Sequence, residues 1–110
     1  MGKAATHWII QRLTAITIIP LTLWFLFSLI GNISKSYQEM QNWVKEPVIA
    51  ILLAGSVISI FWHARLGMQV IIEDYIHGEV SRKLALTVLN AMIVGLVTIC
   101  LVSIVIIVLR

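Results

Sequence analysis

The fold of this chain follows from one stretch of its sequence, Ser56-Val-Ile-Ser-Ile-Phe-Trp-His63-Ala-Arg65-Leu-Gly-Met-Gln-Val-Ile-Ile-Glu-Asp74-Tyr75. The stretch overlaps an apolar segment, residues 47–72, whose one formal charge is Arg65. A helix needs about 20 apolar residues to cross a bilayer, so this segment predicts a transmembrane helix. Ionisable side chains inside a span are energetically costly, which makes His63 and Arg65 candidate functional residues.

Two further segments, residues 13–33 and 84–109, are apolar and free of charged side chains. Of the 110 residues, 60% are hydrophobic and 12% are charged, whereas a soluble domain carries about 25% charged residues. We therefore predict an all-α membrane protein with a single domain, residues 1–110. Its three transmembrane helices would form part of a hetero-oligomeric helix bundle. Three spans leave no room for a soluble domain, so we expect no catalysis from the chain alone.

The polar segments between the spans indicate the topology. We expect loops over residues 35–46 and 73–83, and Pro47 suits the first turn of the second helix. Pro20 should kink the first helix, with Thr17 available to the backbone carbonyl that the proline leaves free. The positive-inside rule favours an N-terminus on the cytoplasmic or matrix side. In that orientation Lys3, Arg12, Arg82 and Lys83 lie inside, against Lys35, Lys45 and Arg110 outside. The net charge of +3 is small, and we expect no nucleic-acid partner.

His63 is the candidate metal ligand of the second span. It belongs to a narrow, slightly polar stripe at helical spacing, made of Ser56, Ser59, His63, Gly67, Val70 and Asp74. Gly55 and Ser59 form a small-xxx-small pair that favours close approach of another backbone. Gly67, one turn beyond His63, leaves room for a flat ring, and a neutral imidazole is a common axial ligand of haem iron. The alternative is an interhelical hydrogen bond from His63 to a serine or a backbone carbonyl.

Arg65, Asp74 and Tyr75 each allow two interpretations. Arg65 either extends toward the inner headgroups or pairs with an anionic group of a cofactor. The Tyr75 phenol can donate a hydrogen bond to the carbonyl of a lipid-soluble compound, with the Asp74 carboxylate beside it supporting that bond or passing protons. The alternative for this pair is an interfacial tyrosine next to a carboxylate at a helix end.

The sequence His63-Ala-Arg-Leu-Gly67-Met68-Gln69-Val70, followed by Asp74-Tyr75, resembles the D-type hydrophobic membrane anchor of succinate dehydrogenase, respiratory complex II. Gln11-Arg12-Leu-Thr14-Ala15-Ile16 resembles the start of that family's first span. The similarity covers most of the chain, and its specific part lies in these two motifs.

The resemblance implies a role in electron transfer from succinate to ubiquinone, in the tricarboxylic acid cycle and the respiratory chain. The implied partners are a flavoprotein with FAD, an iron-sulfur subunit and a C-type anchor of the cytochrome b556 type, all held at the lipid membrane. His63 would be one axial ligand of a haem b shared with the C-type anchor. Tyr75 would bind the quinone with support from Asp74, and Arg12 would lie near the haem propionates or the quinone. The implied location is the bacterial inner membrane, or the mitochondrial inner membrane, as a multi-pass protein.

Two alternatives to this function remain open at the level of sequence. An anchor of quinol:fumarate reductase has similar architecture and works in the reverse direction, and no residue here sets the direction. A structural or assembly protein of the membrane without a cofactor would use His63 only for packing.

Overall fold

The computed structural model describes residues 2–110, which form four α-helices: α1 (Lys3–Asn32), α2 (Tyr37–Lys45), α3 (Pro47–Tyr75) and α4 (Glu79–Leu109). Three of them, α1, α3 and α4, are long and apolar enough to cross a membrane. This part of the chain contains no strand. The predicted all-α fold with three long apolar helices is therefore confirmed.

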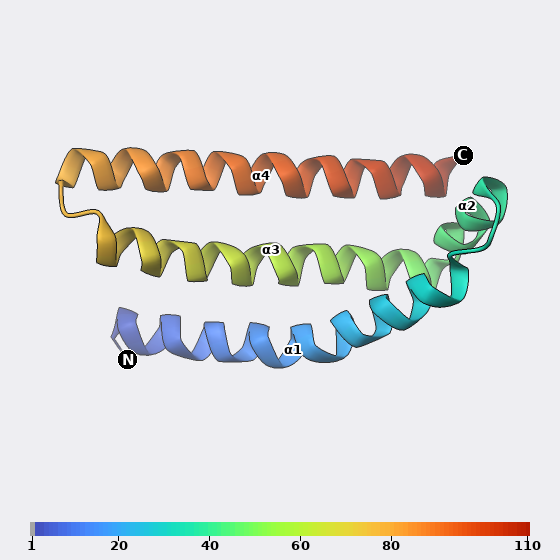
Figure 1. The fold of residues 1–110 in the computed structure, drawn as a ribbon, viewed down its shortest axis with the longest axis horizontal. Coiled ribbons are helices and arrows are strands. Elements are labelled where there is room, and N and C mark those ends of the chain that lie inside the picture. The colour runs from blue at the N-terminus through green and yellow to red at the C-terminus, as the bar shows by residue number, and fades with distance from the viewer. Residues whose placement is uncertain (1) are drawn as a thin grey trace.

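Helix α3 is the central element of the structure (Figure 1). It packs against α4 on one side and against α1 on the other, and the whole chain measures 50 × 25 × 24 Å. The beginning of α1 and the α3–α4 loop lie at one end, whereas α2 and the end of α4 lie at the other (Figure 1). The two ends of the chain are thus at opposite ends of the molecule, as three membrane crossings require.

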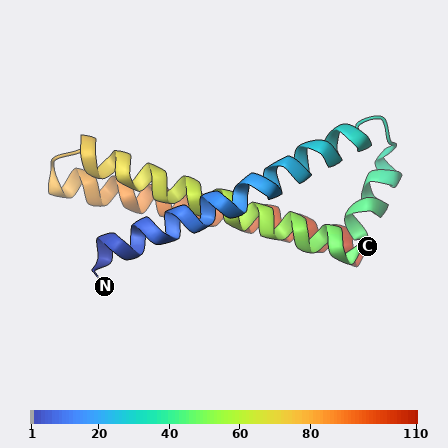
Figure 2. The ribbon, with the colours of Figure 1, turned by 90° about the horizontal axis from the view of Figure 1, so that it is seen from below.

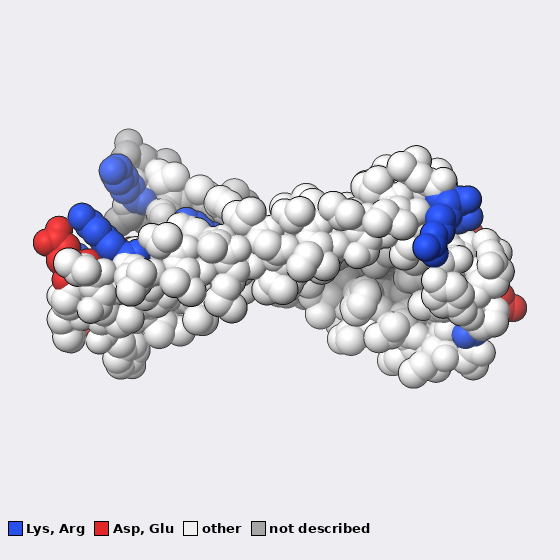
Figure 3. Space-filling view, turned by 90° about the horizontal axis from the view of Figure 1, so that it is seen from above, with Lys and Arg blue, Asp and Glu red and all other residues white. Residues whose placement is uncertain are grey.

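Helix α1 crosses α3 obliquely and moves away from it beyond the crossing (Figure 2). Charged side chains gather at the two ends of the molecule and are almost absent from its waist (Figure 3). Few apolar side chains are buried within the chain: Leu66 and Leu89 are the buried hydrophobic residues among those described. Most of the apolar surface of the long helices is therefore exposed on the outside of the chain.

The segment 35–46 is not the loop that we expected, because residues 37–45 form α2. Ser36 caps this helix: its Oγ accepts a hydrogen bond from the Glu39 amide at 3.2 Å, and Glu39 Oε2 accepts one from the Ser36 amide at 2.9 Å. Such a capping box satisfies two backbone donors at the start of a helix. In addition, Trp43 stacks on Trp24 of α1 with ring centroids 6.2 Å apart. This contact connects α2 to the second half of α1.

The other local predictions can be compared with α1 and α3. Helix α1 begins at Lys3, so the polar residues before the first apolar segment are already helical. Pro20 lies inside α1, but Thr17 does not bond the carbonyl that the proline frees: its hydroxyl donates to the Leu13 carbonyl at 2.9 Å. A threonine in a helix reaches the carbonyl three or four residues before it, whereas Pro20 frees the carbonyl of residue 16, which makes that expectation wrong. Pro47 stands at the start of α3, as predicted.

Candidate functional site

His63 of α3 meets α1 through a hydrogen bond between side chains. Its Nδ1 lies 3.1 Å from Thr14 Oγ1, and Thr14 Oγ1 also lies 2.9 Å from the Gln11 carbonyl. Both side chains are half-buried between the two helices. The partner of His63 is therefore a threonine, and not the serine or backbone carbonyl that the sequence alternative named.

A cavity of about 300 Å³ adjoins His63 and is lined by Trp8, Gln11, Arg12, Ala15 and His63. Arg12 lies over the Trp8 ring, with Cζ 5.1 Å from the ring centroid. This cation–π contact holds the guanidinium at the cavity wall. Two residues that the sequence singled out separately, Arg12 and His63, are thus brought together by the crossing of α1 and α3.

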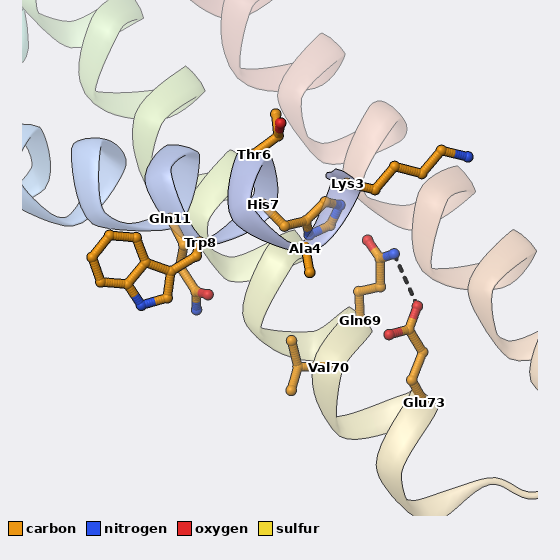
Figure 4. Close-up of a pocket in the computed structure, with 9 residues that line it drawn as sticks. All are labelled: Lys3, Ala4, Thr6, His7, Trp8, Gln11, Gln69, Val70 and Glu73. Atoms are coloured by element: carbon orange, nitrogen blue, oxygen red, sulfur yellow. Dashed lines mark hydrogen bonds between the residues drawn. The ribbon is translucent and has the colours of Figure 1, made fainter. Parts of the chain in front are cut away.

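A larger cavity of about 630 Å³ lies toward the start of α1 (Figure 4). Its lining comes from α1 and from the last turns of α3: Lys3, Ala4, Thr6, His7, Trp8, Gln11, Gln69, Val70 and Glu73. Trp8 and Gln11 line both cavities, which are therefore neighbours. The last turns of α3 contribute a hydrogen bond from Gln69 Nε2 to Glu73 Oε1 at 3.1 Å, whereas Gln69 Oε1 is buried without a partner among the described residues.

Asp74 and Tyr75 form the last positions of α3 and are both exposed. The Tyr75 side chain is 79% exposed. Within residues 2–110 neither side chain makes a hydrogen bond, and neither lines either of the two cavities described above. From these turns, Gln69, Val70 and Glu73 line the larger cavity, and the sequence analysis gave no role to Gln69 or Glu73.

The Arg65 side chain contacts α4, the second long helix that packs against α3. Its Nε donates to Asn90 Oδ1 of α4 at 2.7 Å, and its Cζ lies 5.4 Å from the centroid of the Trp62 ring. Neither of the two roles considered for Arg65 included a bond to α4, and the sequence analysis missed Asn90. An asparagine inside an otherwise apolar span was the available signal, because a polar group there needs a partner.

The predicted stripe on α3 is confirmed in part. A side-chain carbon built at Gly67 would meet nothing within 4 Å among residues 2–110, so the space at Gly67, one turn from His63, is open in this chain. The same holds at Gly55, where no other backbone of this chain makes the close approach that we expected. Ser56 is buried, and its hydroxyl donates to the Leu52 carbonyl of its own helix at 2.7 Å.

Comparison with known proteins decides the family. The family described as "Succinate dehydrogenase/Fumarate reductase transmembrane subunit" matches residues 1–106. The chain belongs to this family. The match runs through all four helices, so it includes both the Thr14–His63 contact and the Asp74-Tyr75 end of α3. No solved structure matches the chain.

Curated relatives of this anchor family are named in the same way. A succinate dehydrogenase hydrophobic membrane anchor subunit from Rickettsia bellii is 41% identical over 70 residues, which cover 64% of this chain and 56% of that protein. One from Rickettsia conorii is 31% identical over 90% of this chain and 74% of its own length. A succinate dehydrogenase membrane anchor subunit from Reclinomonas americana is 40% identical over 73% of this chain and 69% of its own length. These names agree with the prediction of a membrane anchor without catalytic activity of its own.

Proposed function

We propose that this chain anchors a succinate dehydrogenase to the membrane and contributes to its path of electrons to ubiquinone. The observation that carries this function is the family match over residues 1–106, together with relatives named as anchors of succinate dehydrogenase. The proposed partners are a flavoprotein, an iron-sulfur subunit and a C-type anchor in the same bilayer. We propose a bacterial or mitochondrial inner membrane, with the beginning of α1 and the α3–α4 loop on the cytoplasmic or matrix side.

The residues around His63 fit a haem b shared with the C-type anchor. No group of three or more His, Cys, Asp or Glu side chains in residues 2–110 is placed to hold a metal ion. A porphyrin supplies four nitrogen ligands itself, so one imidazole from this chain is a sufficient contribution. The open space at Gly67 and the position of Arg12 on the same cavity as His63 also suit a flat, anionic ring system. When bound, haem b supplies a centre that accepts and donates one electron.

The quinone site that we propose includes Tyr75 and Asp74. Both side chains are exposed at the end of α3 and lack hydrogen-bond partners in the described part of the chain. A phenol at this position is free to donate to a quinone carbonyl, and the neighbouring carboxylate can supply a proton relay. Because the two side chains lie on the surface of this chain, the rest of the quinone site would come from the partner subunits.

A tagged form of this chain, purified from its own membrane, tests the function. We expect the flavoprotein, iron-sulfur and C-type subunits to co-purify and the reduced complex to show the absorption bands of b-type haem. His63→Ala should remove or shift those bands, whereas His77→Ala, on the exposed loop after α3, should leave them unchanged. Purification without these subunits would overturn the anchor function. An unchanged spectrum in His63→Ala would remove His63 from the axial position.

The direction of electron flow distinguishes the proposed function from its main alternative, a quinol:fumarate reductase. An anchor of quinol:fumarate reductase belongs to the same family, whereas the relatives compared here are named for succinate dehydrogenase. We expect the purified complex to reduce ubiquinone with succinate faster than it reduces fumarate with a quinol. The opposite ratio would favour the fumarate reductase.

A further inference from the structure

We propose that Thr14 is a positioning residue that fixes the tautomer of His63, keeping the proton on Nδ1 and leaving Nε2 as the nitrogen that binds haem iron. The inference rests on the proposed function, because it concerns the same histidine. It adds a residue of a different helix, Thr14 of α1, to the haem site.

The hydrogen bonds of Thr14 indicate which ring nitrogen of His63 carries the proton. A threonine hydroxyl has one proton to donate and two lone pairs to accept with. Thr14 Oγ1 lies 2.9 Å from the Gln11 carbonyl, which can only accept, so the hydroxyl proton is used there. Toward His63 Nδ1, 3.1 Å away, Thr14 Oγ1 can then act only as an acceptor. With the hydroxyl proton on the Gln11 carbonyl, the neutral His63 ring would carry its proton on Nδ1.

The other ring nitrogen of His63 is Nε2. A neutral imidazole with a proton on Nδ1 has its lone pair on Nε2. No residue among 2–110 makes a hydrogen bond to His63 Nε2; the Thr14 contact, through Nδ1, is the one recorded for this side chain. Nε2 is thus free for a ligand, and a histidine that binds a metal commonly donates its other N–H to a fixed acceptor.

The position of Thr14 on α1 places its hydroxyl beside His63. Thr14 lies on α1, one turn after Gln11, and both Gln11 and Ala15 line the small cavity together with His63. Thr17, three residues farther along α1, bonds only the Leu13 carbonyl of its own helix. Of these two threonines, Thr14 is therefore the one that joins α1 to α3. Thr17 provides a matched control.

The bond has a measurable consequence for haem. An acceptor on Nδ1–H raises the basicity of the imidazole, and a more basic axial ligand stabilises ferric iron over ferrous iron. Removing the acceptor should therefore favour the ferrous state. The net value of one hydrogen bond corresponds to a change of about two- to tenfold in an equilibrium constant.

Redox titration of the haem in the assembled complex tests the proposal. At an ambient potential near the wild-type midpoint, Thr14→Val should raise the ratio of ferrous to ferric haem by about two- to tenfold. Thr14→Ala, which removes the hydroxyl without a second methyl group, should act in the same direction. Thr14→Ser, which keeps the hydroxyl, and Thr17→Val should both stay at the wild-type ratio. An unchanged ratio in the Val or Ala variant overturns the proposal.

A structure of the wild-type complex gives a second measurement that needs no variant. We expect iron on His63 Nε2 with Thr14 Oγ1 within hydrogen-bond distance of Nδ1. Iron on Nδ1, or Thr14 moved away from the ring, overturns the role of Thr14 even if the haem is present. A wild-type complex without b-type haem, or a normal spectrum in His63→Ala, is instead a failure of the proposed function, so the two failures are distinguishable.

Discussion

His63 and Arg65, separated by one residue on α3, bond different neighbouring helices. His63 contacts Thr14 of α1, and Arg65 donates to Asn90 of α4. Successive helical residues are about 100° apart, so two side chains at this spacing point to nearly opposite sides of a helix. The two contacts together fix the rotation of α3 about its axis, and with it the direction in which the imidazole faces.

The bond between Arg65 and Asn90 should be measurable as a coupling between α3 and α4. In a double-mutant cycle with Arg65→Met and Asn90→Leu, we expect a coupling free energy of about 1 kcal/mol, the upper part of the range found for hydrogen bonds between membrane helices. The measurement is the unfolding of the purified chain in bicelles. The pair Arg82→Met and Asn90→Leu serves as control, because Arg82 makes no bond to Asn90, and its effects should be additive. Additivity in the Arg65 cycle as well would argue against the bond.

Substitution of Tyr75 by phenylalanine should separate quinone chemistry from assembly. The change removes one hydroxyl from an exposed position, so the fold should be unaffected. We expect the rate of ubiquinone reduction by succinate to fall by up to about tenfold, the value of one hydrogen bond at the upper end of its usual range. Succinate oxidation with an artificial dye, which does not use the quinone site, should remain. Tyr37→Phe at the opposite end of the molecule is the control, and equal loss in both assays for Tyr75→Phe would point to failed assembly.

Loss of the Arg12 charge should shift the ratio of ferrous to ferric haem in the direction opposite to that expected for Thr14→Val. A cation near the iron favours the reduced state, because reduction adds a negative charge. Arg12→Gln removes a guanidinium from the cavity that His63 lines, so the ratio of ferrous to ferric haem at a fixed potential should fall severalfold. Arg82→Gln, a cation at the same end of the molecule on α4, should have a smaller effect. A rise in the ferrous fraction, or equal effects of the two substitutions, would place Arg12 away from the haem.

The capping box of α2 should control the stability of that short helix. Ser36→Ala removes the side-chain acceptor for the Glu39 amide, and the loss of an N-cap costs about 1 kcal/mol. Amide hydrogen exchange in α2 should therefore become about fivefold faster, while exchange in α3 and α4 remains unchanged. Ser34→Ala, two residues earlier and outside any helix, is the matched control. Protection of α2 that does not change in Ser36→Ala would show that tertiary contacts such as Trp43–Trp24 hold the helix instead.

The spans were predictable because hydrophobic length is a local property of the sequence. Residues 47–72 and 84–109 lie wholly within α3 and α4, and residues 13–33 lie within α1 except for the last one. Helix α2 was also within reach, since Ser36 and Glu39 have the spacing of a capping box. We expected a loop there because the segment is polar and short.

The contacts of the site were not predictable in the same way. Spacing along α3 separates the side of His63 from that of Arg65, but it does not say which residue of another helix each one meets. Thr14 lies 49 residues before His63, and Asn90 lies 25 residues after Arg65. Which of these residues meet is set by how α1 and α4 pack against α3. Asp74 and Tyr75 remain a prediction from the sequence pattern, because both side chains are exposed and make no hydrogen bond within residues 2–110.

The small number of buried apolar side chains in this chain affects how its fold is stabilised in a membrane. With Leu66 and Leu89 as its buried hydrophobic side chains, the described part of the chain has little apolar packing of its own to lose. Lipid tails offer apolar groups an environment as favourable as a protein interior, so the hydrophobic effect does not hold the three long helices together. A newly made copy would therefore acquire most of its rigidity only on joining the partner subunits that we propose.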